Sequence, residues 1–196
     1  RFIFNGNLDD DDTIVGGTGT DTLVILGDAD GGAAAGALAV SGVETLEIDS
    51  DTAGDDLDFD VFANPSEITS VVIDSLADAD SVTLTDTQAS TFTVNNGTAN
   101  TQEDIAAVVI DLKDATGSSD AVTINLNNKQ SGDAGSQDTF QVTTGITANS
   151  IETINLNTSF VSSEGTAEDI TIAALTSSTI SALNISGTAD LTITAA

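Results

Sequence analysis

The sequence predicts an all-β protein, a parallel β-solenoid whose short strands stack coil upon coil. Two observations lead to this fold class. Val, Ile and Thr are abundant, and apolar residues alternate with polar ones in short runs, as half-buried strands require. One apolar spacing also recurs along the chain in units too short to bury an apolar face without stacking on one another. An antiparallel β-sandwich is the alternative, because its short strands have similar spacings.

The first 42 residues are predicted to be a region of calcium-binding turns and a connector of small residues. Residues 16–24 match the nonapeptide G-G-x-G-x-D-x-U-x, where U is a large apolar residue, at every specified position. Nine residues upstream, Asp12 opens a half copy, and nine residues downstream Asp30 repeats the acid. The glycines allow a tight turn with converging carbonyls, and Asp21 supplies a carboxylate. The alternative is a flexible acidic turn without an ion.

The predicted ligands of this calcium site come from successive turns. Asp12 and Asp21 would share one ion, Gly17 and Gly19 would offer their carbonyl oxygens, and Asp10 and Asp30 are further candidates.

From residue 43 onward, an apolar residue is followed three and five positions later by two more. This pattern occurs five times, beginning at Val43, Ile68, Ile105, Ile151 and Ile180. A second alternating strand follows each copy, at 56–59, 81–84, 121–124, 169–172 and 190–193. Residues 43–196 are therefore predicted to form about five irregular coils with loops of varied length.

Asparagines are expected to stack between these coils. The pairs Asn125/Asn127 and Asn155/Asn157 occupy matching places in successive copies, which favours ladders of hydrogen-bonded amides.

The glycine turn resembles the repeats-in-toxin (RTX) family of secreted bacterial proteins. Together with the steps Glu44-Thr-Leu46 and Asp190-Leu-Thr-Ile193, it is similar to surface-layer and large adhesin-like proteins of Gram-negative bacteria. The resemblance implies a calcium-dependent structural or adhesive role outside the cell or at its surface.

Composition limits the possible functions. The chain has 3 basic and 32 acidic residues, a formal charge of −29, which disfavours nucleic-acid partners and membrane insertion and calls for cations to screen the acids. His and Cys are absent, so His- and Cys-dependent nucleophile systems and N/S zinc sites are excluded. Asp58 and Asp60 would share one face of a strand, but the chain lacks the His and Arg/Lys motifs of β-helical pectin hydrolases.

We therefore expect a non-enzymatic, calcium-stabilised extracellular structural protein that associates with copies of itself in a lattice or fibre, with surface polysaccharide as a further candidate partner. A carbohydrate- or host-binding adhesin module is the alternative. Steps such as Thr83-Leu-Thr85 also permit an ice-binding solenoid, and a polysaccharide-cleaving β-helix is the remaining hypothesis. The lack of an initial Met and of an apolar leader favours a fragment or a processed product.

Overall fold

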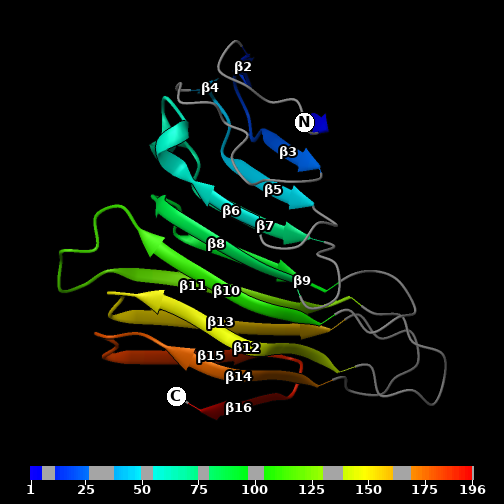
Figure 1. Cartoon of the computed structure of the whole chain (residues 1–196), viewed down its shortest axis with the longest axis vertical. Helices are drawn as coiled ribbons and strands as arrows, with labels where there is room; N and C mark the ends of the chain where they lie inside the picture. The colour runs from blue at the N-terminus through cyan, green and yellow to red at the C-terminus, as the bar shows by residue number, and fades with distance from the viewer. Residues whose placement is uncertain are drawn as a thin grey trace.

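The protein is a two-sheet parallel β-solenoid whose coils stack along the long axis of the molecule (Figure 1). The structure, a computed structural model, describes residues 1–5, 12–26, 38–49, 55–74, 80–96, 104–129, 139–160 and 169–195. Within these ranges every strand ladder is parallel. The named ladders are β1–β3, β3–β5, β5–β7, β7–β9, β9–β11, β11–β13, β13–β15, β6–β8, β8–β10, β10–β12, β12–β14, β14–β16 and β2–β4. This confirms the solenoid prediction over the antiparallel sandwich.

Two long sheets form opposite walls of the solenoid. The eight-stranded sheet contains, in order, β1 (Phe2–Asn5), β3 (Thr22–Leu26), β5 (Thr45–Asp49), β7 (Ser70–Asp74), β9 (Thr91–Asn95), β11 (Ala121–Asn128), β13 (Thr153–Phe160) and β15 (Ala182–Gly187). The six-stranded sheet contains β6 (Asp55–Asp58), β8 (Asp80–Thr87), β10 (Ile105–Leu112), β12 (Phe140–Asn149), β14 (Ile170–Thr176) and β16 (Leu191–Ala195). A short pair, β2 (Thr13–Val15) and β4 (Ala39–Ser41), completes the N-terminal coils, and two 3-10 turns, η1 (Phe59–Val61) and η2 (Pro65–Glu67), follow β6.

The chain alternates between the two walls, so the described strands from residue 43 onward form six two-strand coils where the spacing predicted about five. Two of the five units contain a third strand, β9 in the unit that begins at Ile68 and β12 in the unit that begins at Ile105, and these two strands make the sixth coil. Because β9 is a full wall strand, the strand of the third copy, β10, joins the six-stranded sheet, whereas β5, β7, β13 and β15 of the other copies join the eight-stranded one.

The eight-stranded sheet continues across the predicted boundary at residue 42. β3 pairs with β5 in parallel, with Leu23 opposite Leu46 and Ile25 opposite Ile48. The connector of small residues predicted before residue 43 contains β4 in its described part. The N-terminal turns and the later coils therefore share one wall.

The core is a set of side-chain columns that run along the solenoid axis. One column contains the register partners Leu46, Val71, Phe92, Ile124 and Leu156, all fully buried. Because successive strands lie only about 4.8 Å apart, each side chain packs directly on those of the coils before and after it. The apolar residues of the alternating sequence pattern are thus the ones that point into the core.

Amide and hydroxyl side chains form ladders on the eight-stranded sheet, as predicted, but in a register two residues away from the expected one. The Asn157 amide donates to Asn125 Oδ1 at 2.9 Å, and the Asn127 amide donates to Asn95 Oδ1 at 2.8 Å. Asn155 lies opposite Thr123, not Asn125. Here the coil repeat is 32 residues. The lengths of the loops set this repeat, so it could not be predicted from the local apolar pattern.

The Glu-Thr step at the start of two strands has a structural role. The Glu44 carboxylate accepts the backbone N–H of Asp21 at 2.8 Å, and the Glu152 carboxylate accepts that of Asp120 at 2.9 Å. The carbonyl of each of these aspartates in turn accepts the N–H groups of the glutamate and of the following threonine. The glutamates therefore join one coil to the previous one at the corner where the chain enters the eight-stranded sheet.

Candidate metal centre

The N-terminal glycine turn has the backbone conformation that its sequence predicted. Gly17 and Gly19 have φ angles of +93° and +123°, which disfavour residues with a side chain. Gly16 packs so closely on the next coil that a Cβ there would lie 1.7 Å from the carbonyl oxygen of Gly42. The turn therefore needs its glycines for conformation and for close packing as well as for any role in binding an ion.

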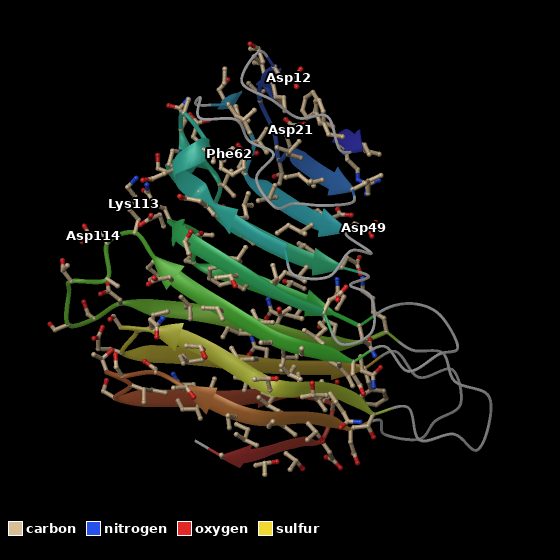
Figure 2. All side chains as sticks on the ribbon, viewed as in Figure 1. Asp12, Asp21, Asp49, Phe62, Lys113 and Asp114 are labelled. Atoms are coloured by element: carbon tan, nitrogen blue, oxygen red, sulfur yellow. The ribbon has the colours of Figure 1, made fainter. Side chains whose placement is uncertain are left out.

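Two of the predicted ligands, Asp12 and Asp21, lie at the N-terminal end of the solenoid (Figure 2). Asp12 directly precedes β2 and Asp21 directly precedes β3, so the two acids lead into strands of different sheets. The Asp21 backbone takes part in the corner hydrogen bonds with Glu44. Asp10 and Asp30 lie outside the described residues, and the ligand assignment of this turn stays a prediction.

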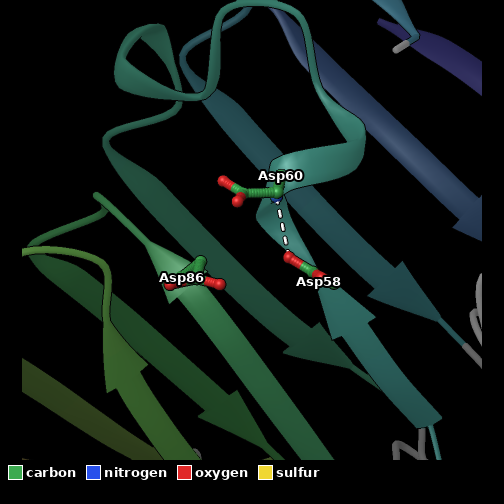
Figure 3. A group of neighbouring side chains, drawn as sticks. All are labelled: Asp58, Asp60 and Asp86. Carbon is green, nitrogen blue, oxygen red and sulfur yellow. Dashed lines mark hydrogen bonds between the residues drawn. The ribbon is translucent and has the colours of Figure 1, made fainter. Parts of the chain in front are cut away.

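A different group of acids converges in the described part of the chain. Asp58, Asp60 and Asp86 each offer a carboxylate oxygen, and these atoms lie within 4.8 Å of one another (Figure 3). Asp58 and Asp60 are exposed and Asp86 is half-buried. The first two were predicted to share one face of a strand. Instead Asp58 ends β6 and caps η1, its Oδ1 accepting the Asp60 N–H at 2.9 Å.

Asp86 comes from the neighbouring coil through an irregularity in β8. Between β8 and β10 the register shifts after Leu84, because Ile110 pairs with Leu84 while Leu112 pairs with Thr87. Asp86 lies in this bulge with φ +53°, a left-handed conformation that aspartate and asparagine tolerate better than most residues. The bulge is what allows a residue of β8 to join the end of β6.

Lys113 is the counter-ion already present at this cluster. Its ammonium forms an ion pair with Asp60 Oδ1. The hydrogen bond with Asp60 raises the pKa of Lys113 above 10.5; burial partly opposes the shift, and the charges of Asp60, Asp86 and Asp58 reinforce it. Because the folded-state pKa of Lys113 is the higher one, the stability that this shift contributes does not decline until the pH exceeds 10.5, and it is lost as the pH rises through the folded-state value.

The net charge and the donor atoms of the cluster limit the kinds of ion that it could bind. Three carboxylates and one ammonium leave a formal charge of −2, and every donor atom is an oxygen. The other two basic residues pair elsewhere, Arg1 with Glu47 at 2.9 Å and Lys129 with Asp74 at 3.2 Å. A group of oxygen donors with net negative charge has the ligand type that hard cations such as Ca²⁺ and Mg²⁺ take.

A shallow cavity of about 240 Å³ lies beside the cluster, where the chain crosses from β10 to β11. Its polar lining includes Gln88, Ser90, Asp114 and Asp120. Asp120 Oδ2 is shielded from solvent and has no hydrogen-bond partner in the described ranges. Asp114 and Asp120 are the two carboxylates among the residues that line the cavity.

For a divalent cation bound at the cluster, replacement of Lys113 by Gln is expected to strengthen binding by a factor of up to about five, the upper end of the range for one exposed charge pair. The cation would then no longer compete with an ammonium for Asp60. Isothermal titration of the chain with CaCl₂ measures the change. Lys129→Gln removes the same charge at Asp74 and serves as the matched control, and equal effects of the two substitutions would contradict the prediction.

The sequence contains a weak signal for this cluster. Between the inward-facing Leu84 and Thr87 lie two outward residues, Thr85 and Asp86, where strict alternation allows one. This break in the alternation marks the bulge in β8, but nothing in the neighbouring sequence shows that β6 ends beside the bulge.

No family model, no curated protein and no solved structure matches this chain. In the described ranges, no helix is long and apolar enough to cross a membrane. The class of protein that the structure itself defines is an acidic, parallel two-sheet β-solenoid.

Proposed function

We propose that this chain is a non-enzymatic structural module, a β-solenoid stabilised by divalent cations that acts in an extracellular or cell-surface assembly. The observation that carries the proposal is the convergence of Asp58, Asp60 and Asp86 from two successive coils. A cation held there links the end of β6 and η1 to β8. The cation would therefore oppose separation of the two coils along the solenoid axis.

The rest of the molecule agrees with a structural role. The core columns continue through the coils, the amide ladders add coil-to-coil hydrogen bonds, and the Glu44 and Glu152 carboxylates join further coils at a corner. These features all connect one coil to the next. A chain with charge −29 also repels itself when compact, so bound cations offset a destabilising term.

Calcium is therefore expected to raise the melting temperature. At a free concentration of about one hundred times Kd, one site adds about 2.7 kcal/mol, which for a chain of this length corresponds to roughly 5–10 °C. Circular dichroism melts in CaCl₂, in MgCl₂ and in EDTA measure the shift. Identical spectra and melting temperatures in CaCl₂ and EDTA would overturn the proposal.

Variants locate the ion. Asp86→Asn keeps a residue that tolerates positive φ while removing the charge, so it should reduce the calcium shift without a large loss of stability in EDTA. Asp21→Asn tests the glycine turn in the same way. Asp169→Asn, an exposed acid near β14, is the matched control for a general charge effect. A shift lost only in Asp21→Asn would assign the ion to the turn.

A carbohydrate-binding module is the second candidate function, and the cavity at Asp114 and Asp120 favours it. Carboxylate, amide and hydroxyl groups around about 240 Å³ could accept and donate hydrogen bonds to one sugar unit. A glycan array probed with the chain and with Asp120→Asn tests this function. Binding that the substitution abolishes would support it.

A further inference from the structure

The outer face of β9, β11 and β13, the β9–β13 face, contains no charged side chain. In a chain of 32 acidic and 3 basic residues, these three strands contain none of either. Apart from Ala121, the residues that alternate with the inward-facing ones are threonine, asparagine and serine. In the same sheet the acids lie on earlier strands, Glu47 and Asp49 in β5 and Asp74 in β7. The β9–β13 face is therefore a polar but neutral surface on a strongly acidic molecule.

The backbone of this face is regular. β9 pairs with β11 and β11 pairs with β13 without a register shift, so Thr123 lies opposite both Thr91 and Asn155. On the other wall, the ladders β8–β10, β10–β12 and β12–β14 all contain register shifts. The side chains of the β9–β13 face therefore recur in straight rows at the strand spacing of about 4.8 Å.

The rows keep hydrogen-bonding capacity for a partner. Asn125 donates one amide N–H to Thr93 Oγ1 at 3.2 Å and accepts one from Asn157 at 2.9 Å. A carboxamide has two N–H donors and a carbonyl oxygen with two lone pairs, so the ladder uses half of this capacity. Asn125 thus keeps one donor and one acceptor, at a position that the coils on both sides fix.

Two physical conditions select the partner. A rigid partner stays in step with the rows over three coils only if its own groups recur at the same spacing, and a second copy of the face has that spacing by construction. Two copies of a chain with charge −29 can share a buried surface only where no acids meet, because juxtaposed like charges oppose association. The β9–β13 face meets both conditions.

We propose that two copies of this chain associate side by side through their β9–β13 faces, with their solenoid axes aligned. The contact is isologous, so one face suffices and the assembly closes at a dimer. Asparagine and threonine side chains of one copy exchange hydrogen bonds with the same rows of the other. The inference rests on the structural role proposed above and specifies the surface through which such a module associates.

The size of the face sets the strength of the dimer. Three strands about 4.8 Å apart cover about 14 Å along the axis, and a strand of eight residues such as β11 is about 26 Å long, which gives roughly 400 Å² per copy. Stable complexes bury about 800 Å² per partner. The dimer is therefore expected to be weak, with Kd on the order of 100 μM. It should tighten from about 50 mM to about 500 mM NaCl, because salt screens the repulsion between the two acidic bodies.

Sedimentation equilibrium in about 500 mM NaCl, over a concentration series from about 10 μM to about 1 mM, tests the proposal, because this range brackets the expected Kd. The expected result is an average mass that rises from 19.7 kDa toward twice that value and does not exceed it. A mass that stays at 19.7 kDa throughout would refute the proposal. Growth past the dimer would also refute it, in favour of a contact that does not close.

Matched variants identify the face. Thr123→Asp places a charge in the middle strand of the β9–β13 face and should abolish the dimer. Thr147→Asp should leave it unchanged, because Thr147 is also a half-buried, outward-facing strand residue but lies in β12 on the opposite wall. Thr153→Asp is a second test of the same face, and far-ultraviolet circular dichroism confirms that the variants fold. A dimer retained in Thr123→Asp, or lost equally in Thr147→Asp, would contradict the assignment.

Repeating the measurement in CaCl₂ and in EDTA separates this proposal from the preceding one. A dimer in both media with no calcium-dependent melting shift would leave the face assigned and remove the cation. A calcium-dependent shift with a monomeric chain would do the reverse.

Discussion

Phe92→Ala is expected to lower the free energy of unfolding by about 3–5 kcal/mol, the range for large-to-small changes in a rigid core. Phe92 is fully buried in β9, between its register partners Val71 in β7 and Ile124 in β11. Hydrogen-bonded strands on both sides fix the spacing of the coils, so the cavity cannot close by moving one of them. Urea denaturation followed by circular dichroism measures the change.

Thr93→Ala is the control for this position. Thr93 is the next residue of β9, half-buried on the outer face, where its hydroxyl accepts a hydrogen bond from the Asn125 amide at 3.2 Å. Loss of this hydrogen bond should lower the free energy of unfolding by about 1 kcal/mol or less. A cost for Phe92→Ala no larger than that of Thr93→Ala would show that the central column is not tightly packed.

Gly145→Ala is expected to destabilise the protein by about 3 kcal/mol or more, because conformational strain and steric overlap act together. Gly145 lies within β12 at φ +136°, a region essentially restricted to glycine. A Cβ there would lie 2.4 Å from the carbonyl oxygen of Ala174 in β14, and that oxygen belongs to the backbone and cannot turn aside. Thermal and urea unfolding in EDTA measure the loss without any contribution from bound ions.

Gly19→Ala separates the cost of the conformational strain from the cost of the steric overlap. Gly19 has a similar φ of +123°, but a Cβ there would meet nothing within 4 Å. Only the conformational strain remains, about 1–2 kcal/mol. The difference between the two substitutions measures the overlap with β14. Equal losses would indicate that β14 moves away at little cost.

The inward and outward faces of the strands could be predicted from the sequence, because alternation is a local property with a period of two residues. Leu46 and Ile48, or Ile154 and Leu156, are fully buried as their spacing indicated. The glycine turn was equally local, since a positive φ at Gly17 and Gly19 depends on the turn itself.

The sequence could not show which wall each strand joins. The copy at Ile105 has the same apolar spacing as the copy at Ile68, yet it lies in the opposite sheet. That outcome depends on how many strands come between the copies, and therefore on whether the short run at Phe92 forms a full wall strand. The two-residue offset of the Asn125 ladder has the same origin, because coil length is set by loops.

By itself, then, the sequence determined the alternating strands with their inward faces, the high acidity and the turn at 16–21. Only the tertiary structure decided that the ladders are parallel, that Asp58, Asp60 and Asp86 meet, and that Asn157 lies opposite Asn125. The physical reason is the range of the interactions. Alternation and turn conformation depend on neighbours in the chain, whereas convergence and exposure depend on residues a coil or more away, which stacking brings within a few ångströms.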